Sequence, residues 1–180
     1  MLTIAEYLDL EERSSVRHEF VGGQRIAQAR TSERHNRIAI NIVNRLAAVL
    51  EDDPCRVLMS DVKLRVGDDV VYYPDVMLVC DPHDTDPYIK TRPCLIVEVL
   101  SPSTETIDRR EKLMAYRRIE TLETYLLVHQ DEPRVVRNFR DSHGAWWQEE
   151  LDGEARILLP CPQTELQFPQ IYRGVTFDST

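Results

Sequence analysis

The chain has 180 residues, of which 42% are hydrophobic and 29% are charged, and its formal net charge is −9. This length suits a single domain, residues 1–180, with one core. The composition is that of a globular protein and excludes disordered and fibrous classes. The acidic balance argues against a nucleic-acid coat protein or a membrane-surface protein, but it allows an enzyme that meets nucleic acid through a basic patch and a bound metal.

No segment resembles a membrane anchor or a secretion signal. The longest apolar runs have fewer than ten residues, whereas a membrane helix needs about 20. The first residues, MLTIAEYLDLEERSS, are acidic and lack the basic-then-apolar pattern of a signal peptide. We therefore expect a cytoplasmic protein that does not associate with membranes.

The four cysteines are Cys55, Cys80, Cys94 and Cys161. No two of them form a CxxC pair, so the sequence does not support a cysteine-based zinc site. We expect all four to be reduced thiols that lie mostly in the core.

The first third of the chain predicts a short helix, a hairpin and a long helix. Thr3 and Glu6 form a capping box for a helix that ends near Leu10. The runs VRHEFV and QRIAQA flank Gly22-Gly23, which indicates a β-hairpin with Glu19 on its first strand. A longer helix is expected from a Ser32 cap to about residue 51, because apolar residues recur there at helical spacing.

The rest of the chain predicts mainly strands. Residues 55–66 and 70–79 read as two strands joined by a turn at 67–69, and 81–92 as an exposed loop. The run 94–100 reads as a central strand covered on both faces, followed by a helix at about 105–119, three further strands and an irregular tail from residue 157. This order predicts an α/β fold with a central mixed sheet flanked by helices.

Glu98 lies in the most apolar run of the chain, CLIVEVL. A buried carboxylate usually has a shifted pKa, an ion-pair partner or a bound metal. A buried ion pair with an arginine and a metal site are therefore both compatible with this position.

Asp75 follows Pro74 in the strand YYPDVMLV. Proline cannot donate a ladder hydrogen bond, so Asp75 could simply cap the opening that Pro74 leaves. Alternatively, Asp75 and Glu98 could form an oxygen-rich site of the kind that Mg²⁺ or Mn²⁺ prefers, with the Val99 carbonyl as a further ligand. A metal there could polarise a phosphoryl oxygen and activate a water.

Lys112 belongs to the predicted helix after the Glu98 strand. Asp108, Lys112 and Tyr116 recur every four residues and so share one face. A surface ion pair between Asp108 and Lys112 explains this spacing without any catalytic role.

These segments together resemble the Uma-type restriction endonuclease family, which belongs to the PD-(D/E)xK nuclease superfamily. The resemblance rests on YPDVMLV, LIVEVLSPST and the residues Asp108, Lys112 and Tyr116. It extends to HEFVGGQ, SERH, SDVKLRV and ETYLLV, and so covers most of the chain. It implies a restriction-endonuclease-like core and a metal-dependent nuclease.

The resemblance also assigns roles to individual residues. Pro74-Asp75 matches the first half of the superfamily motif, and Glu98 matches its second acid. The superfamily lysine should follow two residues after Glu98, but that position is Leu100, and Lys112 matches the site to which the family moves it. Glu19 matches an acid before a glycine turn that can bind the metal through water.

His35 also matches a family position. It is expected on the apolar side of the long helix, near Ile38 and Ile42. Two interpretations fit this position. His35 could be a half-buried histidine with satisfied hydrogen bonds, or it could contact the site residues or a phosphate.

The favoured function is Mg²⁺-dependent hydrolysis of DNA phosphodiester bonds, with Lys112 orienting the attacking water and offsetting charge on the phosphate. Four arginines could contact the phosphates or could simply be charged residues on helix surfaces: Arg34, Arg37, Arg109 and Arg110. A catalytically silent nuclease-fold binding protein and a phosphatase or nucleotide hydrolase are the alternatives. A homodimer would suit cleavage of both strands of a duplex.

Overall fold

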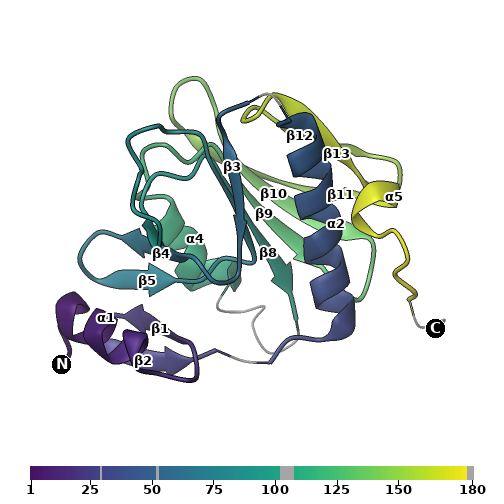
Figure 1. The fold of residues 1–180 in the computed structure, drawn as a ribbon. Coiled ribbons are helices and arrows are strands. Elements are labelled where there is room, and N and C mark those ends of the chain that lie inside the picture. Colours follow the sequence, from purple (N-terminus) through teal and green to yellow (C-terminus); the bar gives the residue numbers. More distant parts are fainter. Residues whose placement is uncertain (29, 52, 102–107, 178–180) are drawn as a thin grey trace.

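The computed structural model describes residues 1–28, 30–51, 53–101 and 108–177, with the side chains at 108 and 109 excluded. Its central feature is a six-stranded mixed sheet with the order β11-β10-β9-β8-β6-β3 (Figure 1). The strands are β3 (Arg56–Met59), β6 (Val76–Val79), β8 (Leu95–Leu100), β9 (Thr124–His129), β10 (Arg134–Arg140) and β11 (Trp146–Asp152). Strands β8 and β9 are parallel, and the other neighbours in this sheet are antiparallel.

A second sheet has five strands in the order β2-β1-β5-β4-β7. These are β1 (His18–Val21), β2 (Gln24–Ala27), β4 (Lys63–Val66), β5 (Val70–Tyr72) and β7 (Ile89–Lys90). A two-stranded sheet is formed by β12 (Arg156–Leu159) and β13 (Thr164–Gln167). The helical elements are α1 (Ile4–Glu12), α2 (Glu33–Val49), the π-helical turn η1 (Asp108–Lys112), α4 (Leu113–Tyr116) and α5 (Phe168–Ile171).

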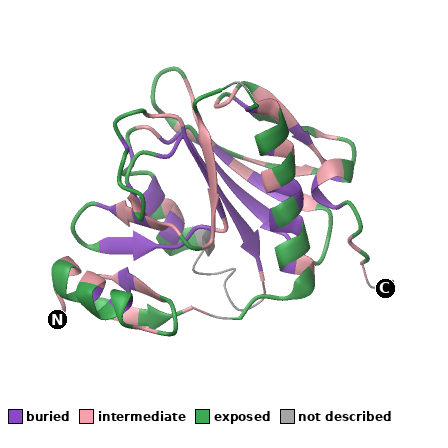
Figure 2. Ribbon diagram, viewed as in Figure 1, coloured by how far each residue is buried: buried purple, intermediate pink, exposed green. Residues whose placement is uncertain are grey.

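The six-stranded sheet is covered on both faces, as predicted. On β8, Leu95, Val97 and Val99 pack in the same core cluster as α2, α5 and the β12–β13 pair. Ile96 and Leu100 pack with α4 and the five-stranded sheet on the other face. All six residues of β8 are buried, and Figure 2 shows the central strands as the most continuous buried part of the molecule. The prediction of a mixed sheet flanked by helices is confirmed.

The N-terminal predictions are confirmed in detail. Thr3 and Glu6 form a reciprocal capping box at the start of α1. The β1–β2 hairpin turns at Gly22 and Gly23, whose φ angles of 54° and 88° favour glycine. Ser32 caps α2 through a hydrogen bond from the main-chain N–H of His35.

The two long strands predicted at 55–66 and 70–79 are each broken, and their halves lie in different sheets. The first break is at Ser60, whose φ is 39°. The second is at Pro74, which has no N–H to donate. The two breaks meet, because the N–H of Ser60 donates to the carbonyl of Pro74 at 3.1 Å. Together they carry the chain from one sheet to the other beside Asp75.

Two segments predicted to be irregular contain regular structure. The predicted exposed loop 81–92 holds β7, and Lys90 is buried there because its ammonium donates to main-chain carbonyls of Asp84, at 3.0 Å, and Asp86. The tail forms β12, β13 and α5. The start of the helix predicted at 105–119 lies outside the described residues, and its described part ends at Tyr116.

The prediction of reduced cysteines is wrong for this structure. Cys55 is bonded to Cys80, and Cys94 to Cys161. The register of β3 and β6, in which Arg56 pairs with Val79, brings the first two cysteines opposite each other. Separations of 25 and 67 residues hide both pairs from local sequence patterns. Among the described helices, none is long and apolar enough to span a membrane.

Candidate active site

Glu98 lies on β8 and is only 3% exposed. Alternation along the strand places its side chain on the face of Ile96 and Leu100, toward α4 and the five-stranded sheet. Its Oε1 accepts hydrogen bonds from the Tyr116 hydroxyl at 2.7 Å and from the Lys112 ammonium at 3.0 Å. The carboxylate is therefore buried together with a cation and a neutral donor.

Lys112, at the end of η1, is 6% exposed and reaches two acids. Its Nζ lies 3.0 Å from Glu98 Oε1 and 3.2 Å from Glu19 Oε1, which projects from β1. The same ammonium lies 5.2 Å from the ring centroid of Tyr72. The interpretation of Lys112 as a surface residue is therefore wrong, and the side chain of Asp108, its proposed surface partner, lies outside the described residues.

Asp75 lies directly before β6, across from Glu98. Val76 pairs with Val97 in the β6–β8 ladder, and continuing this register by one step places Asp75 opposite Glu98. Asp75 Oδ2 accepts the main-chain N–H of Val99 at 2.7 Å. Asp75 thus contacts the residue that follows Glu98. The irregularity expected at Pro74 is present, whereas the break at Ser60 was not predicted.

His35 is buried in the first turn of α2 and contacts Asp75. Its Nε2 lies 3.1 Å from Asp75 Oδ2, and the side chain is 8% exposed. The structure therefore joins the two alternatives for this residue, since His35 is buried and also touches the site. Asp75 is held from the α2 side of the sheet, whereas Lys112 and Tyr116 hold Glu98 from the α4 side.

The donors at this end of the sheet suit a hard divalent cation by type. Asp75 and Glu98 supply carboxylate oxygens on adjacent strands, with Glu19 nearby, and Mg²⁺ and Mn²⁺ prefer such ligands. Oδ1 of Asp75 accepts no hydrogen bond from the described residues. Within those residues, groups of three candidate ligand atoms less than 4.8 Å apart occur only around the cysteines. The acids therefore match a hard cation by donor type, with Asp75 contacted from the α2 side and Glu98 from the α4 side of the sheet.

Two tyrosines beside the acids stay protonated. Burial, and next the charge of Glu98, raises the pKa of Tyr116 well above its ordinary value. Burial, and next the charge of Glu19, raises the pKa of Tyr72. Tyr116 therefore donates to Glu98 throughout the neutral range. Its ring packs edge-to-face against Tyr72 and Tyr125, with centroid distances of 5.6 and 5.0 Å.

Sequence reasoning missed Tyr72 and a second buried acid, Glu11. Glu11 of α1 accepts hydrogen bonds from the main-chain N–H of His18, from Arg25 and from the Tyr73 hydroxyl. Burial would raise the pKa of Glu11, but these donors outweigh it and hold the pKa below its ordinary value. Glu11 thereby links α1 and the hairpin to the strand break before Asp75, and no local pattern in the sequence marks this contact.

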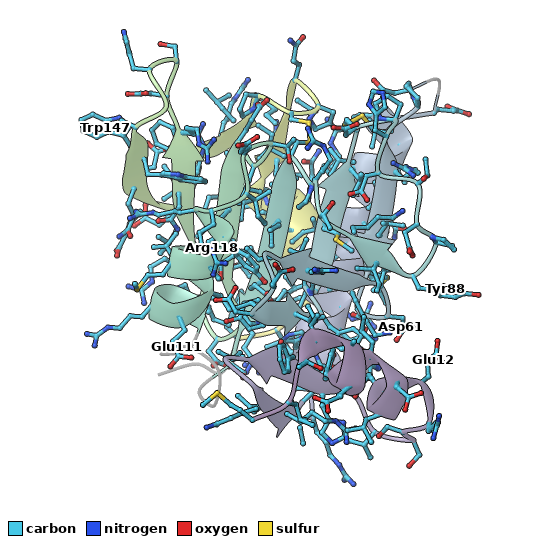
Figure 3. All side chains as sticks on the ribbon, turned by 90° about the vertical axis from the view of Figure 1, so that its left-hand side faces the viewer. Glu12, Asp61, Tyr88, Glu111, Arg118 and Trp147 are labelled. Atoms are coloured by element: carbon cyan, nitrogen blue, oxygen red, sulfur yellow. A yellow bond between two sulfur atoms is a disulfide. The ribbon has the colours of Figure 1, made fainter. Side chains whose placement is uncertain are left out.

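Figure 3 draws the side chains of the molecule and labels Glu111 among them. Glu111, the neighbour of Lys112, is exposed, whereas Lys112 is buried. Adjacent helical residues point in different directions, so a single step in sequence separates a solvent-facing acid from the buried lysine. The direction of Lys112 is therefore set by its place on the helix.

The chain is similar in sequence to two curated proteins and in fold to a solved structure. The chain is 33% identical over 178 residues to the uncharacterized protein slr1290 of Synechocystis sp., covering 98% of this chain and 94% of that protein. It is 37% identical over 158 residues to the uncharacterized protein sll1609 of the same organism, covering 86% and 89%. The crystal structure of a "putative nuclease belonging to DUF820" from Anabaena variabilis superposes with a TM-score of 0.81 at 17% identity, covering 98% of this chain and all of that one.

A family model also matches nearly the whole chain. The Uma2 model, described as "Putative restriction endonuclease", aligns with residues 4–170. This range includes every site residue discussed above, and the structural match supports the nuclease-like fold. The chain therefore belongs to the Uma2 family of restriction-endonuclease-like proteins.

Proposed function

We propose that the protein is a metal-dependent endonuclease that hydrolyses phosphodiester bonds in DNA, with Mg²⁺ or Mn²⁺ as its cofactor. The observation that carries the proposal is the buried group in which Lys112 contacts Glu98 and Glu19, one strand from Asp75. Removing Glu98 and Lys112 from water, with the half-buried Glu19 beside them, is unfavourable unless these charges are well paired. The family model that matches this chain is described as a restriction endonuclease. In such a family, this group of charges fits an active site better than a purely structural role.

Each residue then has a distinct task. Asp75 and Glu98 would hold the cation, with the Val99 carbonyl as a further oxygen ligand and Glu19 acting through water. When bound, the cation would polarise the phosphoryl oxygen and lower the pKa of a water.

The other polar groups orient these ligands or the substrate. His35 orients Asp75, and Tyr116 orients Glu98 by donating to Oε1. Lys112 supplies a compact positive charge next to the acids, suited to hold the attacking water and to offset charge on the phosphate.

A hollow beside the start of α2 offers a place for the DNA backbone. Its volume is about 400 Å³, and Arg34, Arg37 and Gln130 lie in its lining. It is lined in part by the first turns of α2, the helix that also supplies His35. The paired charges limit this role, because Arg34 contacts Asp131 at 2.9 Å and Arg37 contacts Glu33 at 3.7 Å. A homodimer would present two such sites to the two strands of a duplex.

One observation favours a second candidate, a nuclease-fold protein that binds without cutting. The Lys112 ammonium lies between Glu98 and Glu19 and already neutralises part of their charge. A protein that never binds a metal could keep this arrangement as a structural ion-pair network. Metal binding separates the two candidates.

The decisive experiment combines metal binding with cleavage. Magnesium should raise the melting temperature of the protein, because a ligand that binds only the folded state stabilises it. Supercoiled plasmid should be nicked in Mg²⁺ or Mn²⁺ and not in a chelator. Glu98→Gln should abolish both effects, whereas Glu12→Gln, at an exposed position of α1, should retain both.

Three results would decide against the proposal. Equal magnesium responses in Glu98→Gln and the parent protein would overturn the site. Absence of any metal response would establish the silent binding protein. Hydrolysis of nucleotides but not of plasmid would show that the same site acts on small phosphate esters.

A further inference from the structure

Four cysteines gather at the ends of β6 and β8 that lie farthest from Asp75 and Glu98. Cys80 directly follows β6, and Cys94 directly precedes β8. Cys55 precedes β3, and Cys161 lies in the turn between β12 and β13. Four separate segments of the chain therefore deliver one sulfur each to the same place.

The two disulfides lie in contact with each other. Cys80 Sγ is 3.5 Å from Cys161 Sγ and 3.7 Å from Cys94 Sγ, although neither is its bonded partner. The sulfurs of Cys80, Cys94 and Cys161 all lie within 4.8 Å of one another. Two disulfides that merely join strands have no need of this contact, whereas a site built from four sulfurs requires it.

Two of the distances between the disulfides match a tetrahedral metal centre. A Zn–S bond of about 2.3 Å places neighbouring sulfurs of a tetrahedron roughly 3.8 Å apart. The distances between the two disulfides are 3.5 and 3.7 Å. Cys55 Sγ lies within 4.8 Å of Cys80 Sγ but outside the group that Cys80 forms with Cys94 and Cys161. Once the two S–S bonds are opened, small rotations would separate the bonded pairs, and the side chain of Cys55 would rotate toward the other two sulfurs.

The surroundings also suit such a centre. Cys94 is buried, the other three cysteines are half-buried, and all four pack against the core cluster beneath α2. Thiolate ligands select soft cations such as Zn²⁺ over the hard cations expected at the acidic site. Limited access to water protects a thiolate centre from exchange.

We propose that Cys55, Cys80, Cys94 and Cys161 form a redox-controlled zinc site. In the reduced protein four thiolates bind one Zn²⁺, and in the oxidised protein the two disulfides of this structure replace it. The proposal is independent of the nuclease activity, because it uses none of the residues assigned to the acidic site.

The chemistry of the switch balances. Two equivalents of a dithiol reduce the two disulfides, forming four protein thiols and two oxidised dithiols. Binding of Zn²⁺ to the four thiols releases four protons. Two equivalents of hydrogen peroxide with four protons reverse the change, because each peroxide accepts two electrons as one S–S bond forms. The products are two disulfides, free Zn²⁺ and four water molecules.

Cobalt provides a direct test, because four thiolates give Co²⁺ an intense charge-transfer absorption that oxygen ligands do not. Reduced protein, prepared anaerobically with a phosphine reductant, should bind one Co²⁺ per chain with this absorption. One equivalent of Zn²⁺ should bleach it. Hydrogen peroxide should then release the zinc to a chromogenic chelator and restore two disulfides per chain by mass spectrometry. Protein kept oxidised is the matched negative control.

Variants identify the ligands. Cys161→Ser and Cys55→Ser should each weaken metal binding by more than about 100-fold, beyond the loss caused by removing a residue that only supports a ligand. Asp53→Asn removes a carboxylate that lies within 4.8 Å of Cys55 and Cys80. It should leave stoichiometry and spectrum unchanged. Glu98→Gln should also leave the cobalt spectrum unchanged, which separates this site from the acidic one.

Two results would overturn the proposal. The first is reduced wild-type protein that lacks the cobalt absorption, which would leave the cysteines as two plain disulfides. The second is undiminished binding by both serine variants, which would place the metal elsewhere. Circular dichroism checks that each variant is folded. If a variant does not fold, the cobalt absorption of the reduced wild-type protein still decides whether the thiolate site exists.

Discussion

Strands β6 and β8 carry different chemistry at their two ends. At one end, Asp75 and Glu98 are held by hydrogen bonds and ion pairs from both faces of the sheet. At the other end, Cys80 and Cys94 are held by covalent bonds to Cys55 and Cys161. The same pair of strands thus carries polar, non-covalent contacts at one end and a closed sulfur cluster at the other. We expect changes at the acidic end to affect mainly activity, and changes at the cysteine end to affect mainly stability.

The largest effect should come from Lys112. Lys112→Arg keeps the charge, but the larger guanidinium cannot occupy the same buried position between Glu98 and Glu19. Cleavage should fall by roughly 100-fold or more, as expected when a transition-state contact is lost. Plasmid-nicking rates at saturating magnesium measure the change. Lys63→Arg, on β4, is the control and should stay near the wild-type rate, and retention of activity in Lys112→Arg to within about threefold would refute the assigned role.

The second effect tests the other end of the strands. Replacing both Cys94 and Cys161 by serine removes a bond that closes a 67-residue separation. Under oxidising conditions the free energy of unfolding should fall by about 2–4 kcal/mol, mainly because the unfolded chain becomes less constrained. Urea unfolding measures this loss. Cleavage well below the unfolding transition should change little, and a large loss of activity in folded protein would contradict the division between the two ends.

Tyr116→Phe sharpens the comparison within the acidic end. The change removes the hydroxyl that donates to Glu98 at 2.7 Å and keeps the ring that packs against Tyr125. Stability should fall by about 1 kcal/mol, the net contribution of a typical hydrogen bond. Cleavage should fall by about 10-fold, the lower limit for losing a partner that orients a metal ligand. Thermal unfolding and nicking rates on the same preparation separate the two effects.

Glu11→Gln tests how much the contacts of α1 with the β1–β2 hairpin and with Tyr73 contribute to stability. The donors around Glu11 hold its pKa below the ordinary value of 4.5. A carboxyl whose pKa is lowered by folding stabilises the folded state above that ordinary value, and the contribution disappears as pH falls through the folded pKa. The variant should therefore lose about 1–3 kcal/mol at neutral pH, and much less in acid. A stability difference that does not change between neutral pH and strong acid would show that Glu11 contributes through packing alone.

The smallest effect should come from Arg37. Arg37→Ala removes one positive charge from the hollow beside α2 and an exposed contact with Glu33. Stability should hardly change, because exposed ion pairs contribute about 0–1 kcal/mol. In a plot of the logarithm of the DNA association constant against the logarithm of the salt concentration, the magnitude of the slope should fall by about 0.9. Arg13→Ala, at the C-cap of α1, is the control. An unchanged slope in Arg37→Ala would remove Arg37 from the DNA-binding surface.

The sequence predicted the elements whose signals are local. The capping box of Thr3 and Glu6, the glycine hairpin and the apolar face of α2 all involve residues a few positions apart. The fully buried strand β8 was equally visible, because its apolar run has no polar alternation. The prominence of Glu98 followed from that run, since a lone acid within it demands a partner.

The tertiary structure decided which partners meet. The breaks at Ser60 and Pro74 divide two apparent strands between two sheets, and no periodicity within either strand marks this exchange. The pairing of His35 with Asp75 and the pairing of the cysteines depend on sheet register between distant segments. Helix and strand periods determine which face a side chain occupies, but the packing of those faces determines what it contacts. For this reason the sequence and its family resemblance could single out the acids and Lys112 as candidates, whereas only the fold showed that Lys112 is buried between Glu98 and Glu19.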